Sequence, residues 1–162
     1  MTEFNVYQNL IKFLTEKDWQ IICSCPPGGT DNRHRKCLLP RRDLQGSEKG
    51  PRDEVDLIAR NGKSIILVEC KTRLSESLQP LTRRGESDYT KLKRITQTFS
   101  PIQLSTLLRR AHGIDIPTDL MIASVLAVEK VDSDIPGDIT VIEFNKSSRQ
   151  IWATSGLNNL LD

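Results

Sequence analysis

The segment spanning residues 54–73 constrains the fold of this chain more than any other. It reads EVDLIAR, then Asn-Gly-Lys, then SIILVECKTR, so two apolar, β-branched runs flank a turn sequence. Such runs around Asn-Gly predict an antiparallel hairpin with a tight primed turn. Because alternate side chains of a strand share a face, we expect Asp56 near the ladder level of Glu69, with Lys71 on the same face as Glu69.

Two carboxylates and an ammonium group would therefore converge at the open end of an apolar hairpin. Buried like charges repel each other, and burying them without partners is costly. A divalent cation bound between Asp56 and Glu69 would remove that cost. Hard oxygen ligands of this kind suit Mg²⁺ or Mn²⁺.

An Asp followed by a short hairpin and Glu-x-Lys resembles the signature of the PD-(D/E)xK nucleases, the restriction-endonuclease-like superfamily. The matching residues are Asp56, Glu69 and Lys71, with Cys70 as the variable residue between the last two. The resemblance covers about twenty residues, and VECK ends an apolar strand as the family pattern requires. Val55 stands where the family has Pro, which is a departure from the pattern.

The resemblance implies a metal-dependent DNA endonuclease. Asp56 and Glu69 would hold Mg²⁺, for which Mn²⁺ could substitute, and the backbone carbonyl of Cys70 would be a further ligand. Lys71 would assist the attacking water and offset charge on the phosphate. A glutamate of the first helix often points at the metal in this family, and Glu3 is the candidate here. The family's core is αβββαβ, with a central mixed sheet flanked by helices.

Residues 3–17 independently predict an amphipathic helix with Thr2 as its N-cap. Glu3 projects into the middle of the apolar arc, in line with Tyr7 and Leu10, which is unusual for a carboxylate. The alternative is a solvent-exposed glutamate at a frayed first turn, favoured by the helix dipole.

A long segment without periodicity, residues 26–53, is rich in basic side chains and leads into the strand that carries Asp56. We expect this loop, together with Lys91 on a later helix, to contact the DNA backbone. The alternatives are disorder in the absence of a partner and, for Lys91, an ordinary exposed lysine. The candidate DNA-binding residues are Arg33, Arg35, Lys36, Arg41, Arg42 and Lys91.

Charge is distributed unevenly along the chain. Residues 1–112 hold 20 Lys and Arg against 13 Asp and Glu, whereas residues 113–162 hold 3 against 8. The positive part therefore contains the carboxylate hairpin, which favours a polyanionic partner. A solvated positive face is the simpler alternative.

The remaining patterns predict an α/β (α+β) fold. The helices are followed by an apolar strand that permits a parallel crossover back to the hairpin. The expected elements are a strand at 18–25, helices at 88–98 and, after a Ser100 cap, at 101–111, a strand at 119–131, and a last hairpin with strands at 138–144 and 150–154.

The length of 162 residues predicts a single domain. No apolar run is long enough to span a bilayer and no signal-peptide pattern opens the chain, so we expect a cytoplasmic protein with no membrane partner. In that compartment the four cysteines are expected to be thiols. A zinc site from Cys23, Cys25, His34 and Cys37 is an alternative, but strand alternation already accounts for Cys23 and Cys25 as core residues.

Two other classes of function remain open at this point. One is a nucleic-acid-binding module without activity, and the other is an interaction protein whose basic loop docks an acidic partner. Cutting both strands of a duplex with one small site per chain would favour a symmetric homodimer. No separate sequence-reading motif is present, so the DNA specificity is not predicted.

Overall fold

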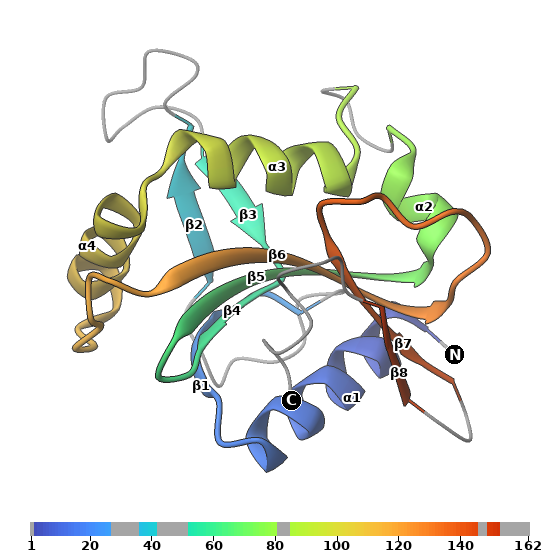
Figure 1. The fold of residues 1–162 in the computed structure, drawn as a ribbon, viewed down its shortest axis with the longest axis horizontal. Helices are drawn as coiled ribbons and strands as arrows, with labels where there is room; N and C mark the ends of the chain where they lie inside the picture. Colours follow the sequence, from blue (N-terminus) through green and yellow to red (C-terminus); the bar gives the residue numbers. More distant parts are fainter. Residues whose placement is uncertain (1, 27–35, 42–51, 81–84, 146–148, 153–162) are drawn as a thin grey trace.

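The computed structural model describes residues 2–26, 36–41, 52–80, 85–145 and 149–152. A six-stranded mixed sheet lies between helices, with α1 on one face and α2 and α3 on the other (Figure 1). The helices are α1 (Glu3–Glu16), α2 (Leu74–Leu78), α3 (Asp88–Thr98) and α4 (Pro101–His112). The strands are β1 (Gln20–Ser24), β2 (Cys37–Pro40), β3 (Arg52–Val55), β4 (Leu57–Arg60), β5 (Ser64–Arg73), β6 (Met121–Lys130), β7 (Thr140–Phe144) and β8 (Arg149–Trp152).

The main sheet has the order β1-β4-β5-β6-β7-β8. Strands β1, β4 and β5 pair antiparallel, β5, β6 and β7 pair parallel, and β8 returns antiparallel to β7. The helices α2, α3 and α4 lie in the chain between the parallel neighbours β5 and β6, as expected for a crossover connection. The predicted mixed α/β architecture, with a central mixed sheet flanked by helices, is confirmed at this level.

The first helix forms as its sequence pattern predicts. Thr2 and Asn5 make a reciprocal capping box, in which the Thr2 hydroxyl accepts from the Asn5 amide at 3.2 Å. The apolar arc is buried against the sheet. Its fully enclosed members are Val6, Tyr7, Leu10, Phe13 and Leu14. This packing fixes the first turn of α1, and hence Glu3, beside the end of β5 that carries Lys71.

The predicted hairpin is β4 paired with β5, but its first arm is shorter than expected. A continuous strand from residue 54 was the wrong prediction, because the chain bends at Asp56 and β3 pairs with β2 in a separate two-stranded sheet. Leu57 pairs with Val68, so the next ladder positions are Asp56 and Glu69. The predicted level of these two carboxylates is therefore confirmed, and the bend turns Asp56 out of the regular strand.

The turn of this hairpin also differs from the prediction. A primed turn needs positive φ at its first central residue, and neither Gly62 nor Lys63 has one. The side chain of Asn61 instead accepts hydrogen bonds from the Lys63 and Ser64 amides, each at 2.8 Å. Asparagine closes the loop through its own carbonyl group, as in an Asx turn.

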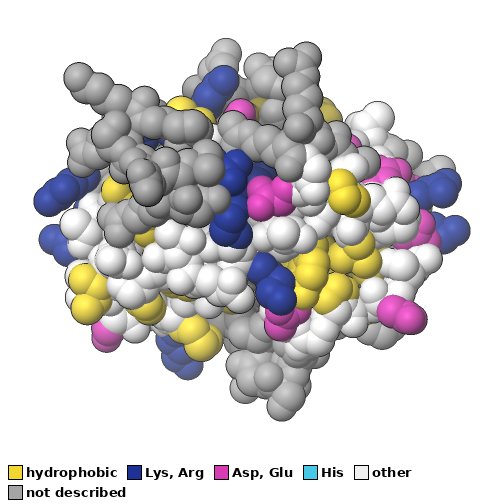
Figure 2. Space-filling model, turned by 90° about the horizontal axis from the view of Figure 1, so that it is seen from above, with side chains coloured by type: hydrophobic (Ala, Val, Ile, Leu, Met, Phe, Trp, Pro, Cys, Tyr) yellow, Lys and Arg dark blue, Asp and Glu magenta, His cyan; other side chains and the backbone are white. Residues whose placement is uncertain are grey.

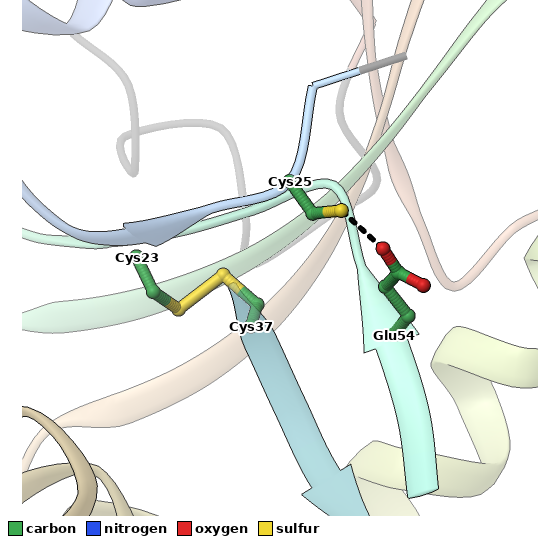
Figure 3. Close-up of a disulfide and its surroundings, with 4 residues drawn as sticks. All are labelled: Cys23, Cys25, Cys37 and Glu54. Carbon is green, nitrogen blue, oxygen red and sulfur yellow. Dashed lines mark hydrogen bonds between the residues drawn. A yellow bond between two sulfur atoms is a disulfide. The ribbon is translucent and has the colours of Figure 1, made fainter. Parts of the chain in front are cut away.

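The expectation that all four cysteines are thiols was wrong. Cys23 and Cys37 form a disulfide between β1 and β2, with their Cα atoms 5.2 Å apart, while Cys25 and Cys70 are free and buried (Figure 3). The Cys25 thiol points at the Glu54 carboxylate of β3. Two sulfurs of the zinc alternative are thus bonded to each other, and His34 lies outside the described residues.

Two further differences concern local structure. The register of β1 shifts between Ile21 and Cys23, so the simple alternation expected for that strand does not hold. Helix α2 forms between β5 and α3, where no helix was expected, because Leu74 packs into the core. No helix in the described ranges is long and apolar enough to cross a membrane.

An ion-pair network fastens the two-stranded sheet to α3. Arg94 donates to both carboxylate oxygens of Asp53, at 2.8 and 2.9 Å, and its Nε donates to Glu86 at 2.9 Å. Asp53 is 3% exposed, and these partners offset the cost of burying its carboxylate. Arg41 also approaches Asp53, at 4.0 Å.

We expect Arg94→Met to lower the free energy of unfolding by about 1 to 2 kcal/mol, because Asp53 loses a bidentate partner but keeps Arg41 nearby. Urea denaturation followed by circular dichroism measures the change. Lys93→Met on the same helix is the matched control, since Lys93 pairs with Asp138 on the surface. Equal losses in the two variants would contradict a special role for the Asp53 network.

Candidate active site

Asp56 lies at the bend between β3 and β4 and points toward the end of β5. Its Oδ2 accepts a hydrogen bond from the Cys70 amide at 2.8 Å. Protein atoms surround the carboxyl group, although part of the residue still reaches solvent. Burial raises the pKa of Asp56 to about 6. The hydrogen bonds with Cys70 and Glu69 favour the charged form and oppose part of this rise.

Glu69 is the second carboxylate of the predicted pair. It shares the face of β5 with Ile65 and Leu67, which pack on the α3 side of the sheet, and it is only 4% exposed. Burial raises the pKa of Glu69 well above its ordinary value, and the neighbouring charge of Asp56 raises it further. The charge of Asp56 therefore opposes the ionisation of Glu69, as expected for carboxylates that converge without a cation.

The counter-charge at Glu69 comes from a helix rather than from the hairpin. The Nζ atom of Lys91, on α3, lies 2.6 Å from Glu69 Oε1 and donates to the Glu54 carbonyl at 2.9 Å. Burial lowers the pKa of Lys91, but the charge of Glu69 more than compensates, so the net direction is upward and the ammonium form is favoured.

Lys71 lies between two other carboxylates. Its Nζ atom is 3.4 Å from Glu3 Oε1 and 3.7 Å from Asp88 Oδ2. Burial alone would lower the pKa of Lys71, but the charges of Asp88 and Glu3 raise it above its ordinary value. Lys71 is thus held as a cation at the end of the strand that carries Glu69.

Asp88 is a site residue that the sequence interpretation missed. It opens α3 directly after the capping Ser87. In the structure it is 8% exposed and its Oδ2 has no hydrogen-bond partner. The spacing of three residues between Asp88 and Lys91, which puts both on one helix face, is the sequence signal that points to it.

The other candidates fall in different places. Glu3 reaches the site through Lys71, in the direction that its place on the helical wheel predicts. The Cys70 side chain packs on the opposite face of the sheet, against α1, so Cys70 meets the site through its backbone. Lys36 is exposed and Arg41 is 9% exposed beside Asp53, so Arg41 would have to leave that contact to reach a phosphate. Arg33, Arg35 and Arg42 lie outside the described residues.

The charges in this cluster do not balance. Among the described side chains, four carboxylates (Glu3, Asp56, Glu69 and Asp88) face two ammonium groups (Lys71 and Lys91). With all four carboxylates ionised, the excess equals the charge of one divalent cation, and the buried Oδ2 atom of Asp88 lacks a hydrogen-bond partner. The oxygen-only donor set fits a hard cation such as Mg²⁺.

Side chains alone do not complete a ligand shell. No group of three His, Cys, Asp or Glu side chains in the described part of the chain is placed to hold a metal ion. The residues fit a Mg²⁺ ion held by Asp56, Glu69, a backbone carbonyl oxygen and water, which is a common kind of ligand set for this ion. Figure 2 looks down on the α3 side, where basic and acidic side chains lie against each other near the middle of the face.

Comparison with known proteins found no match to this chain. No protein family model, curated protein or solved structure matches the chain.

Proposed function

We propose that this protein is a Mg²⁺-dependent DNA endonuclease of the PD-(D/E)xK type. The observation that carries the proposal is the position of Asp56 next to Glu69, with the pKa of each raised by burial. Two adjacent buried carboxylates are difficult to ionise together, and a divalent cation bound between them would offset their charges. The order α1, β1, β4, β5, helices, β6 is compatible with the αβββαβ core of that superfamily.

Each residue of the site has a role that its surroundings support. Asp56 and Glu69 would hold the metal together with the Cys70 carbonyl, and the metal would lower the pKa of a bound water and polarise the phosphate. Lys71 is kept cationic by Asp88 and Glu3, so it can orient the attacking water and offset charge on the phosphate. Glu3 and Asp88 position Lys71 in this account.

The proposed substrate is DNA. Phosphate contacts by Lys and Arg supply most non-specific nucleic-acid affinity. The basic residues of the 26–53 segment precede Asp56 in the chain, and Lys36 from that segment is exposed. A symmetric homodimer would place two such sites on the two strands of a duplex.

A divalent-metal-dependent cleavage assay tests the proposal. The purified protein is incubated with supercoiled plasmid, linear duplex, single-stranded and branched DNA, in Mg²⁺, in Mn²⁺ or in EDTA. We expect cutting of at least one substrate with either metal and none in EDTA, because the carboxylates need a cation to act on a phosphate. Absence of cutting on all four substrates would contradict the endonuclease proposal.

One observation favours a second candidate, a nucleic-acid-binding module without catalysis. Lys91 already neutralises Glu69, and Lys71 already has two carboxylate partners, so the cluster is stabilised without a metal. Such a module would bind DNA with a steep dependence on salt but leave every substrate intact. The cleavage assay and a binding titration at several salt concentrations together separate the two functions.

A further inference from the structure

The ammonium group of Lys91 lies where a cation bound to Glu69 would have to be. Its Nζ atom is 2.6 Å from Glu69 Oε1, and the side chain is 20% exposed. The residue comes from α3, whereas both proposed metal ligands come from the hairpin and its bend. Helix α3 thus supplies, through Lys91, the counter-charge to Glu69, the most buried carboxylate of the site.

An ammonium group and a divalent cation compete for the same oxygen. Two cations that close to one carboxylate would repel each other, and only the divalent ion can also bridge to Asp56 and draw on water for further ligands. Besides the contact with Glu69, the Lys91 ammonium group donates a hydrogen bond to the Glu54 carbonyl at 2.9 Å. Lys91 therefore has an acceptor that it can keep when it leaves Glu69.

We propose that Lys91 is the counter-ion of Glu69 in the metal-free protein, and that a divalent cation displaces Lys91 from Glu69 when it binds. The proposal rests on the proposed function, because it assumes that Asp56 and Glu69 are the metal ligands. Displacement would leave the ammonium group bonded to the Glu54 carbonyl at the edge of the site, where it could contact a substrate phosphate. In this account metal binding and the release of a phosphate-binding lysine are one event.

The alternative is a permanent structural ion pair. Breaking a partly buried pair costs free energy, and a metal that displaces Lys91 must supply that cost from its own binding. Removing the lysine should therefore tighten metal binding if displacement occurs. A pair that stays intact while metal binds elsewhere would leave the metal affinity unchanged or weaken it.

Mn²⁺ binding in the absence of DNA is the measurement, by titration calorimetry and by the electron paramagnetic resonance of free Mn²⁺. The variants are Lys91→Met, which keeps the aliphatic stem without the charge, and Lys91→Arg, which keeps a cation. Lys93→Met is the matched control, because Lys93 is two residues away on α3 and pairs with Asp138 outside the site. Circular dichroism checks that each variant is folded.

We expect Lys91→Met to bind Mn²⁺ about tenfold more tightly than the unaltered protein, a difference of about 1.4 kcal/mol. Lys91→Arg and Lys93→Met should stay within about twofold of the unaltered protein, which is about 0.4 kcal/mol. Tighter binding by Lys91→Met together with slower DNA cutting would separate the two roles of Lys91. A purely structural role of Lys91 would not tighten Mn²⁺ binding while slowing DNA cutting.

The possible failures are distinguishable. Equal Mn²⁺ affinity in Lys91→Met and the unaltered protein, with DNA cutting intact, would overturn the counter-ion role and leave the endonuclease proposal standing. Tighter binding by Lys91→Met without any DNA cutting would support the counter-ion role and contradict the endonuclease. No Mn²⁺ binding by any variant would overturn both.

Discussion

Lys71→Ala is expected to cut DNA about 100 to 1,000 times more slowly than the unaltered protein, the size of effect seen when one transition-state charge donor is removed. The reason is that Lys71 is the cation nearest the end of the hairpin and is held in its charged form by Glu3 and Asp88. Its contribution grows as negative charge develops on the phosphate, so it acts on the rate more than on binding. Single-turnover cleavage in Mg²⁺ measures the change.

DNA binding should be retained in the same variant. In Ca²⁺, which occupies oxygen sites without supporting most phosphoryl chemistry, the affinity of Lys71→Ala for a short duplex should stay within about threefold of the unaltered protein, since many phosphate contacts share the binding energy. Lys63→Ala, an exposed lysine at the turn end of the same hairpin, is the matched control and should cut normally. Equal cutting rates for Lys71→Ala and Lys63→Ala would refute the role assigned to Lys71.

Asp56→Asn is expected to stabilise the metal-free protein at pH 8 by about 2 to 3 kcal/mol, from the free-energy value of a pKa change reduced for partial exposure. Burial raises the pKa of Asp56 from 3.8 to about 6 in the folded state, so the folded protein holds this proton more tightly than the unfolded chain does. That contribution to stability is fully present below about pH 3.8 and is lost as the pH rises through about 6. Asparagine carries no charge at any pH, so the variant does not lose this stability as the pH rises.

Chemical denaturation at pH 5 and pH 8 in EDTA measures this effect. The gain from Asp56→Asn should be largest at pH 8 and about half as large at pH 5, because the unfolded chain already loses this proton above about pH 3.8. Excess Mg²⁺ should stabilise the unaltered protein at pH 8, because the cation offsets the charges of Asp56 and Glu69, and it should stabilise Asp56→Asn much less. A variant that is less stable than the unaltered protein at pH 8 would show that Asp56 is already compensated without metal.

Local sequence patterns predicted the elements that depend on neighbours in the chain. The first helix, its Thr2 cap and its buried face follow from the spacing of apolar residues, and α4 begins at Pro101 and ends before the left-handed Gly113. The level of Asp56 and Glu69 also followed, because hairpin register is fixed over a few residues by the turn.

The parts that were missed depend on contacts between distant segments. The bend at Asp56 exists because β3 pairs with β2, and the disulfide exists because that pairing brings Cys37 to β1. Lys91 was expected to contact DNA or solvent, and Asp88 was not recognised as a site residue. Only the position of α3 over β5 turns both side chains inward. No local periodicity encodes which helix covers which strand.

The central claim is that Asp56 and Glu69 together seat one divalent cation, and crystallography with Mn²⁺ tests it most directly. The anomalous signal of manganese locates the ion without ambiguity. We predict a peak within about 2.3 Å of a carboxylate oxygen of each residue, a normal coordination distance for a small hard cation, with Lys91 withdrawn from Glu69. A peak elsewhere, or none while Lys91 still contacts Glu69 at saturating Mn²⁺, would contradict the account.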